Sequence, residues 1–235
     1  EIAMTTSPDA TPTPPRRWRA LDAEERRVLG TLIETAKTTP AGYPMTVNAL
    51  VTGCNQRNNR EPLTAYRDLD VEKAIDRLRT SGVVEEIDWM GRAAKYKHLA
   101  YDWFGVSRAE LAVLGELLLR GEQTLGDLRA RAARMEPIAD MAELKPIVDG
   151  LVARGLVVEL TPPGRGQVAT HGCLPPAELE AARARAVGVA VAAPAVASPA
   201  APSSAPGLEA EVATLRAELA ALGERVRVLE ERAGG

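Results

Sequence analysis

Apolar residues recur at helical spacing along three stretches of the first half of the chain, at about residues 23–37, 47–54 and 70–81. The stripe of the first stretch consists of Leu29, Leu32, Ile33 and Ala36. The stripe of the third stretch, spaced i, i+3, i+4 and i+7, consists of Val71, Ala74, Ile75 and Leu78. This spacing predicts three amphipathic helices that bury their apolar faces in a common core.

After the third stretch the pattern becomes that of a β-hairpin. Gly82 is placed to end the helix as a left-handed cap. Two strand-like segments, residues 83–89 and 94–99, flank a turn at residues 90–92. Three helices followed by a hairpin are the winged form of the helix-turn-helix fold. We therefore predict a winged-helix domain at residues 16–104.

An internal repeat predicts a second domain of the same kind. Val28-Leu29-Gly30 matches Val113-Leu114-Gly115 at an offset of 85, and residues 75–86 match residues 148–159 at an offset of 73. A duplicated domain whose first copy has a longer loop explains both offsets. The second domain, residues 105–175, is expected to have helices at about 107–119, 125–133 and 144–154 and strands at 156–160 and 167–171.

The predicted fold class is mainly α with small β wings (α+β), with two tandem winged-helix domains plus a C-terminal coiled coil. Ser107 and Glu110 form a capping-box pattern at the start of the second domain's first helix. The residues expected in the core are Val71, Ile75, Leu78, Val148 and Leu151.

The two ends of the chain differ in composition from these domains. Residues 1–15 are rich in Thr and Pro and are expected to be a disordered tail. Residues 176–207 are rich in Ala and Pro, and we predict a semi-extended linker there because its prolines oppose a packed helix. A coiled coil is predicted at residues 208–232.

The predicted coiled coil has a heptad seam with alternating spacings of four and three. Its seam residues are Leu208, Val212, Leu215, Leu219, Leu222, Val226 and Leu229. Leu at every d position with Val at two of three a positions favours a parallel two-stranded coil, and hence a homodimer. Glu211 would face Arg216 of the second chain, and Arg225 would face Glu230. The alternative is a helix that packs against its own domains.

Charge and composition narrow the range of functions. The net charge is −3, so the whole chain has no positive field that points to nucleic acid. Residues 16–104 carry 15 Lys/Arg and 13 Asp/Glu, which makes this domain the better candidate for phosphate contact. The longest apolar run is far shorter than a membrane span and the start has no apolar signal core, so we expect a cytoplasmic protein without a membrane partner.

The two cysteines and two histidines give no catalytic or metal-site pattern. Cys54 follows Val51 on an apolar helical pattern and is expected to be a buried thiol. His98 and His171 occupy equivalent places in the repeat, which indicates a shared packing role. The sequence has no Gly-rich phosphate loop, zinc-protease motif or nucleophile elbow. We therefore predict no enzyme activity, no cofactor and no metal.

The stretch Cys54-Asn55-Gln56-Arg57-Asn58-Asn59-Arg60-Glu61-Pro62 resembles the YceH family of bacterial proteins. The segments at residues 38–50, 92–98 and 122–129 resemble it as well. The similarity covers about residues 21–174. It implies tandem winged-helix domains, often with a coiled tail, and it implies no activity.

The residues predicted to contact duplex DNA come from the long loop, the third helix and the wing of the first domain. They are Arg57, Arg60, Lys73, Arg77, Arg92, Lys95 and Lys97. The equivalent helix of the second domain presents Pro146, Asp149, Gly150 and Ala153, which offer no positive charge. The leading hypothesis is a dimeric DNA-binding or regulatory protein, and the alternative is a winged-helix scaffold that binds an unidentified protein partner.

Overall fold

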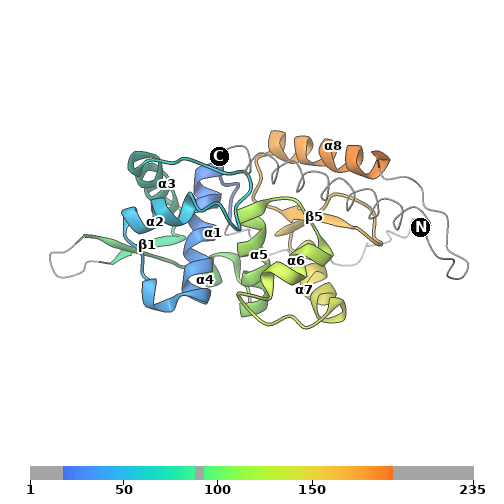
Figure 1. Cartoon of the computed structure of the whole chain (residues 1–235), viewed down its shortest axis with the longest axis horizontal. Helices are drawn as coiled ribbons and strands as arrows, with labels where there is room; N and C mark the ends of the chain where they lie inside the picture. The colour runs from blue at the N-terminus through green and yellow to red at the C-terminus, as the bar shows by residue number, and fades with distance from the viewer. Residues whose placement is uncertain (1–17, 88–92, 193–235) are drawn as a thin grey trace, which may run out of the picture. The chain divides into compact units, whose positions relative to one another are not determined.

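The computed structural model describes residues 18–87 and 93–192. Within these ranges the chain is mainly helical and has two small antiparallel sheets (Figure 1), which confirms the predicted α+β, winged-helix-like class. The order of three helices followed by a hairpin occurs twice. We call residues 18–104 the first half and residues 105–171 the second half.

The first half is built from three helices, a short 3-10 turn and a two-stranded hairpin. Its elements are α1 (Ala23–Thr38), η1 (Pro40–Gly42), α2 (Val47–Cys54), α3 (Asp68–Thr80), β1 (Val84–Ile87) and β2 (Lys95–His98). β1 and β2 pair antiparallel, with Val84 opposite His98. Met45 adds an isolated bridge to Tyr96 on the free side of β2. A short helix that the sequence pattern did not predict, α4 (Ala100–Phe104), leads into the second half.

The second half repeats this order with a slightly larger sheet. Its elements are α5 (Arg108–Arg120), β3 (Gln123–Thr124), α6 (Leu125–Ala132), α7 (Met141–Ala153), β4 (Val157–Glu159) and β5 (Val168–His171). The strand order is β3-β5-β4, with Val157 opposite His171. The two-residue strand β3 was not predicted, and it corresponds to the bridge that Met45 makes in the first half.

Side-chain caps fix the starts of the two equivalent helices α1 and α5. The Asp22 carboxylate accepts from the Glu25 N–H, and the Glu25 carboxylate accepts from the Asp22 N–H. Ser107 and Glu110 make the same reciprocal pair at the start of α5, which confirms the predicted capping box. Each box satisfies two backbone donors that the first helical turn leaves without an intrahelical acceptor.

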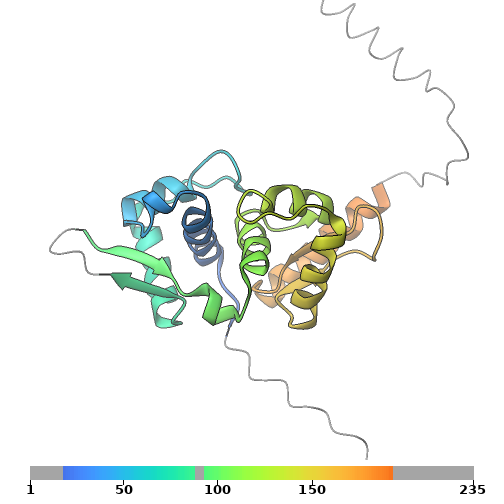
Figure 2. The same cartoon turned by 90° about the horizontal axis from the view of Figure 1, so that it is seen from below.

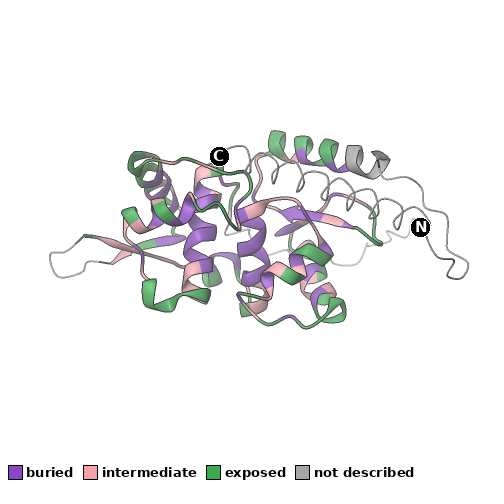
Figure 3. Ribbon diagram, viewed as in Figure 1, coloured by how far each residue is buried: buried purple, intermediate pink, exposed green. Residues whose placement is uncertain are grey.

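The core predictions are confirmed. Val71, Val148, Leu78 and Leu151 are 0% exposed, and Ile75 is 1% exposed. Burial is densest along α1 and α5, which lie side by side in both views and pack against each other between the two halves (Figures 2 and 3). Apolar side chains of both halves thereby join one continuous core cluster.

Two repeat-equivalent glycines allow α1 and α5 to approach closely. A Cβ atom on Gly30 would lie 2.9 Å from Leu119 Cδ2, and one on Gly115 would lie 2.8 Å from Ile33 Cγ2. Both facing side chains are fully buried and cannot swing away into solvent. The Val-Leu-Gly match between the two copies therefore marks the place where the helices cross.

A buried ion network also spans the contact between α1 and α5. Glu34 on α1 and Glu116 on α5 are 6% and 0% exposed. Arg134 bridges the two carboxylates, with Nη2 2.9 Å from Glu116 Oε2. Arg60 pairs with Glu34, and Arg120 pairs with Glu116 at 3.2 Å. A buried carboxylate is costly without such partners, and each one here has two guanidinium groups.

The predicted linker is wrong over its first part, because residues 176–192 form the helix α8 (Pro176–Ala192). Pro176 lies in the first turn, where proline is tolerated, and the next proline is Pro194, so the Ala-rich stretch between them is free to form a helix. Ala182 and Ala186 are buried in a small cluster with Leu160. The predicted tail 1–15, the remaining linker and the predicted coiled coil lie outside the described residues.

Candidate functional site

The surface predicted to read DNA is formed by α3, the loop before it and the hairpin of the first half. The N-terminal part of α3 is acidic: Asp68 and Asp70 lie in its first turn and Glu72 is exposed. The Asp70 carboxylate accepts from the Arg67 N–H at 3.0 Å, and this hydrogen bond is the main cause that holds the Asp70 pKa below its ordinary value. Phosphate groups that approached this end of α3 would meet ionised carboxylates.

The two cations predicted on α3 have different surroundings. Lys73 is exposed and forms no ion pair with the described residues. Arg77 turns toward the start of α1, where Nε lies 2.9 Å from Asp22 Oδ2 and Nη2 lies 3.1 Å from Glu24 Oε2. Arg77 therefore joins α3 to α1, and much of its charge is already balanced.

The prediction that Arg60 contacts DNA is wrong, because its guanidinium group is buried in the protein. Arg60 is 3% exposed and pairs with Glu34. Its Nε donates to the Gly53 carbonyl at 3.0 Å, and Nη1 donates to the Asn59 carbonyl at 2.9 Å. Arg57, three residues earlier, is exposed and remains a candidate for contact.

Asn55 holds the long loop in place from within. Its amide nitrogen donates to the Tyr66 carbonyl at 2.8 Å, and its amide oxygen accepts from the Tyr66 N–H at 2.8 Å. This pair of bonds closes the loop onto the segment that leads into α3. Asn55 therefore has a structural role in the loop.

Carboxylates also accompany the cations of the hairpin. Lys97 pairs with Glu85 across the two strands at 2.9 Å, and Arg79 on α3 pairs with Glu86 at 2.9 Å. Lys95 is half-buried on β2. Arg92 lies outside the described residues.

The equivalent surface of the second half carries little positive charge, as the sequence indicated. Lys145 pairs with Asp149, and Arg154 pairs with Glu110. The exposed residues of α7 include Met141, which is 40% exposed, and Pro146. This face is neutral to acidic and partly apolar.

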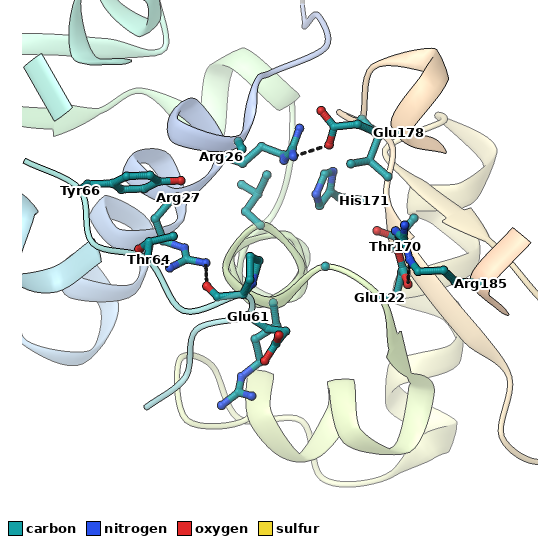
Figure 4. A pocket seen from close by; sticks show the side chains of 16 residues that line it. Arg26, Arg27, Glu61, Thr64, Tyr66, Glu122, Thr170, His171, Glu178 and Arg185 are labelled. Atoms are coloured by element: carbon teal, nitrogen blue, oxygen red, sulfur yellow. Dashed lines mark hydrogen bonds and ion pairs between the residues drawn. The ribbon is translucent and has the colours of Figure 1, made fainter. Parts of the chain in front are cut away.

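A second candidate site is a pocket of about 530 Å³ between the two halves (Figure 4). Its walls come from α1, the loop at residues 61–66, the end of α5, β5 and α8. The imidazole of His171 points from β5 toward the middle of the pocket, close to Arg26. Arg26 in turn pairs with Glu178 on α8 at 2.6 Å, and Arg185 on α8 pairs with Glu122.

Burial sets the protonation state of the pocket histidine. His171 is 2% exposed, and burial, with the nearby Arg26 charge as a smaller cause, lowers its pKa to about 3. His171 is therefore neutral at physiological pH. Arg27 is 3% exposed, and burial lowers its pKa as well, although its guanidinium donates to the Cys54 and Pro62 carbonyls at 3.0 and 2.7 Å.

Sequence reasoning missed this pocket because five separate segments build it. The only signal was the repeat equivalence of His98 and His171, which suggested a shared packing role. The structure gives the two rings different surroundings. His98 Nδ1 accepts from the Ala100 N–H at 3.3 Å, and the ring lies 5.8 Å from that of Tyr43. His171 Nδ1 has no hydrogen-bond partner among the described residues.

Other chemistry-bearing residues form no further site in the described part of the chain. Cys54 and Cys173 are free thiols and both are buried, as predicted for Cys54. Residues 18–87 and 93–192 contain no group of three or more His, Cys, Asp or Glu side chains arranged to hold a metal. No helix within the same ranges has the length and apolar character needed to cross a membrane.

Comparison with known proteins identifies the family. Residues 21–165 match the family described as "Protein of unknown function, DUF480". The chain belongs to this family. It is 48% identical over 160 residues to the UPF0502 protein RB6530 of Rhodopirellula baltica, a match that covers 68% of each chain. It is 45% identical over 143 residues to the UPF0502 protein GSU0233 of Geobacter sulfurreducens, covering 61% of this chain and 63% of the relative.

A third relative matches at a similar level of identity. The UPF0502 protein of Paracidovorax citrulli is 43% identical over 155 residues, which cover 64% of this chain and 66% of the relative. The family agrees with the resemblance inferred from the loop that contains Arg57. The description of the family names no activity, so function rests on the surfaces described above.

Proposed function

We propose that this chain is a non-catalytic binding module whose first half recognises another protein rather than duplex DNA. The observation that carries the proposal is the charge balance on α3 and the hairpin. Arg67, Arg77, Arg79 and Lys97 each lie within ion-pair distance of a carboxylate. Affinity for DNA depends on basic side chains that neutralise phosphates. On this face those four basic side chains are already close to carboxylates of the protein itself.

Apolar exposure at the start of α3 supports a protein partner. Leu63, on the segment that leads into the helix, is 61% exposed, and Leu69, in the first turn of the helix, is 52% exposed. Arg67 and Asp68, which directly precede Leu69, are exposed, and Leu63 lines a surface depression together with Arg57 and Glu61. Apolar side chains within a polar rim are typical of surfaces that bind proteins. The partner is expected to offer a complementary apolar side chain or groove with both signs of charge around it.

The DNA hypothesis keeps one specific observation in its favour. Arg57 and Lys73 are exposed, and neither forms an ion pair with the described residues. With Lys95 and Lys97 on the hairpin they would be the phosphate contacts of a DNA-binding version of this surface. A direct binding measurement separates the two hypotheses.

The test uses the full chain and a random-sequence DNA duplex, followed by fluorescence anisotropy while salt is raised from about 50 to 200 mM. We expect no saturable binding even at the lowest salt. Binding that weakens steeply with salt and disappears in the double variant Arg57→Ala, Lys73→Ala would overturn the proposal.

A second measurement tests the protein partner directly. A photo-crosslinking amino acid at Leu69 should yield a discrete crosslinked protein in the cells that produce the chain. The matched control is the same amino acid at Met141, which is exposed near the start of α7. Leu63→Asp should abolish the Leu69 product. Equal products from both positions would contradict a specific surface on the first half.

A further inference from the structure

The pocket between the two halves has the size of a small-molecule site. Its volume of about 530 Å³ lies within the usual range for ligand pockets, about 300–1,000 Å³. Its lining combines apolar side chains, among them Leu118 and Leu174, with polar groups that converge from several elements. Such a combination provides both apolar contact area and directional recognition.

Four side chains that line this pocket have a buried polar atom without a hydrogen-bond partner in the described protein. One of these atoms, Arg120 Nε, lies 3.2 Å from Glu116 Oε1 in an ion pair, and the other three have no partner of either kind. They are Thr170 Oγ1, His171 Nδ1 and Arg27 Nε. Thr170 is 0% exposed, and the other two residues are 2% and 3% exposed. Buried polar groups are nearly always hydrogen-bonded, because an unsatisfied one costs about 1–3 kcal/mol. Three such atoms around one pocket indicate that a bound molecule is their partner.

The first half provides an internal comparison, because His98 is the repeat equivalent of His171. His98 packs between the rings of Tyr43 and Tyr101 and has a backbone donor for Nδ1. The repeated fold therefore allows the Nδ1 atom of a histidine at this position to be hydrogen-bonded. The lack of a partner for His171 Nδ1 is particular to the second half, where the pocket lies.

Charge determines the class of ligand. Four arginines line the pocket, namely Arg26, Arg27, Arg120 and Arg185, against three glutamates, Glu61, Glu122 and Glu178. Arg26, Arg185 and Arg120 are already paired with Glu178, Glu122 and Glu116, which leaves Arg27 as the lining arginine without an ion pair among the described residues. We propose that this pocket binds a small organic anion, one that carries a carboxylate or phosphate group, between the two halves and α8.

The unsatisfied groups match such a ligand. The Thr170 hydroxyl and the Arg27 Nε–H donate to anionic oxygens, and charge-assisted hydrogen bonds of this kind are the stronger ones. Neutral His171 offers Nδ1 as a donor or as an acceptor according to its tautomer, so it fits either an anionic oxygen or a ligand hydroxyl. This inference does not depend on the proposed function, because the pocket and the α3 surface share no residue named for contact.

The experiment follows the histidine side-chain ¹⁵N resonances of the full chain by NMR. Inorganic phosphate, citrate and adenosine monophosphate are added separately, each up to about 10 mM, to include weak binding. We expect at least one of the two organic anions to move the His171 resonances in a saturable way and to leave those of His98 unchanged. If none of the three probes moves the His171 resonances, the proposal is wrong. Saturation by phosphate alone would also overturn it, as an inorganic-ion site.

Two buried threonines form a matched pair of variants. Thr170→Val removes the unsatisfied hydroxyl, so it should raise the melting temperature of the ligand-free protein and weaken binding of the active probe at least about tenfold. Thr31 is also 0% exposed, but its hydroxyl donates to the Arg27 carbonyl at 2.8 Å. Thr31→Val should lower the melting temperature and leave binding unchanged. Unaltered binding by Thr170→Val would contradict the proposal.

A substitution at the exposed edge of the pocket tests the proposal without disturbing the buried core. The Arg185 side chain is 60% exposed and contacts Glu122, so Arg185→Ala should fold normally. Loss of this charge should weaken binding of the anionic probe several-fold while the His171 resonances of the ligand-free protein stay in place. Binding that is insensitive to Arg185→Ala and to Thr170→Val together would place the probe outside this pocket.

Discussion

At the scale of single residues, two arginines three positions apart have opposite roles. Arg60 is buried against Glu34, whereas Arg57 is exposed. Removing one partner of a buried ion pair typically costs about 3–5 kcal/mol, because the remaining charge loses its compensation. We expect Arg60→Ala to lower the free energy of unfolding by about 3 kcal/mol, since Arg134 still pairs with Glu34.

Arg57→Ala is the matched control for Arg60→Ala. An exposed substitution of this kind should change the free energy of unfolding by no more than about 0.5 kcal/mol. Denaturant midpoints measured for both variants decide the point. Equal midpoints would mean that Arg60 is not part of a buried network.

The two histidines, His98 half-buried and His171 buried, make stability depend on pH. Burial lowers the pKa of His98 to about 4 and that of His171 to about 3, whereas in the unfolded chain both titrate near 6.5. As the pH falls below 6.5 the unfolded state takes up protons that the folded state does not, so stability decreases. Each histidine contributes a slope of up to about 1.4 kcal/mol per pH unit.

The double variant His98→Gln, His171→Gln isolates this contribution. The free energy of unfolding should depend less steeply on pH between 4 and 6 in the variant than in the original chain, because Gln does not titrate. Urea titrations at several pH values provide the two slopes. Identical slopes would contradict the lowered histidine pKa values.

At the scale of elements, the crossing of α1 and α5 depends on its glycines. Gly30→Ala would place a Cβ atom 2.9 Å from a fully buried leucine side chain, so overpacking should outweigh the gain in helix propensity. We expect a loss of about 1–3 kcal/mol in the free energy of unfolding. Gly126 on α6 has only Thr124 Oγ1 nearby, at 3.9 Å, and serves as the control.

Gly126→Ala should be neutral or stabilising, by up to about 1 kcal/mol, because helix propensity acts there without a clash. Thermal unfolding of the two variants gives the comparison. A stabilised Gly30→Ala variant would show that the two helices do not approach as closely as described.

An element could be predicted from the sequence when the residues that determine it are close together along the chain. The stripe that contains Val71 and Leu78 predicted α3 and its buried face, because the helical spacing of apolar residues is visible within one short stretch of sequence. Helix α8 was missed because the prolines from residue 194 onward were taken to characterise the Ala-rich stretch before them as well. Its stability comes partly from packing on Leu160, which lies in a distant segment.

The candidate site was harder to predict for the same physical reason. Arg60 and Arg57 look alike in the sequence, and only the position of Glu34 on another helix decides which of them is buried. The anion pocket needs α1, β5 and α8 to meet, and no local pattern encodes that meeting. The repeat helped most, because the glycines that set the helix crossing occur in both copies.

At the scale of the whole molecule, the predicted coiled coil would determine the number of binding surfaces. Its seam, from Leu208 to Leu229, lies outside the described residues and remains a prediction from the heptad spacing. Two chains joined there would present two α3 surfaces to one partner. The second contact would then form at a raised effective concentration, which strengthens binding without new contacts.

Deleting residues 205–235 should therefore convert a dimer into a folded monomer, because the core described here lies entirely within residues 18–192. Sedimentation equilibrium measures the mass, and far-ultraviolet circular dichroism checks that the helices persist. A full-length variant with Leu215→Asp and Leu222→Asp should also be monomeric, since buried charges at two d positions oppose the seam. Arg227→Ala, outside the seam, should leave the dimer intact. If the full chain and the deletion variant both sediment as monomers, the seam packs within its own chain or stays unpaired, and the bivalent arrangement is excluded.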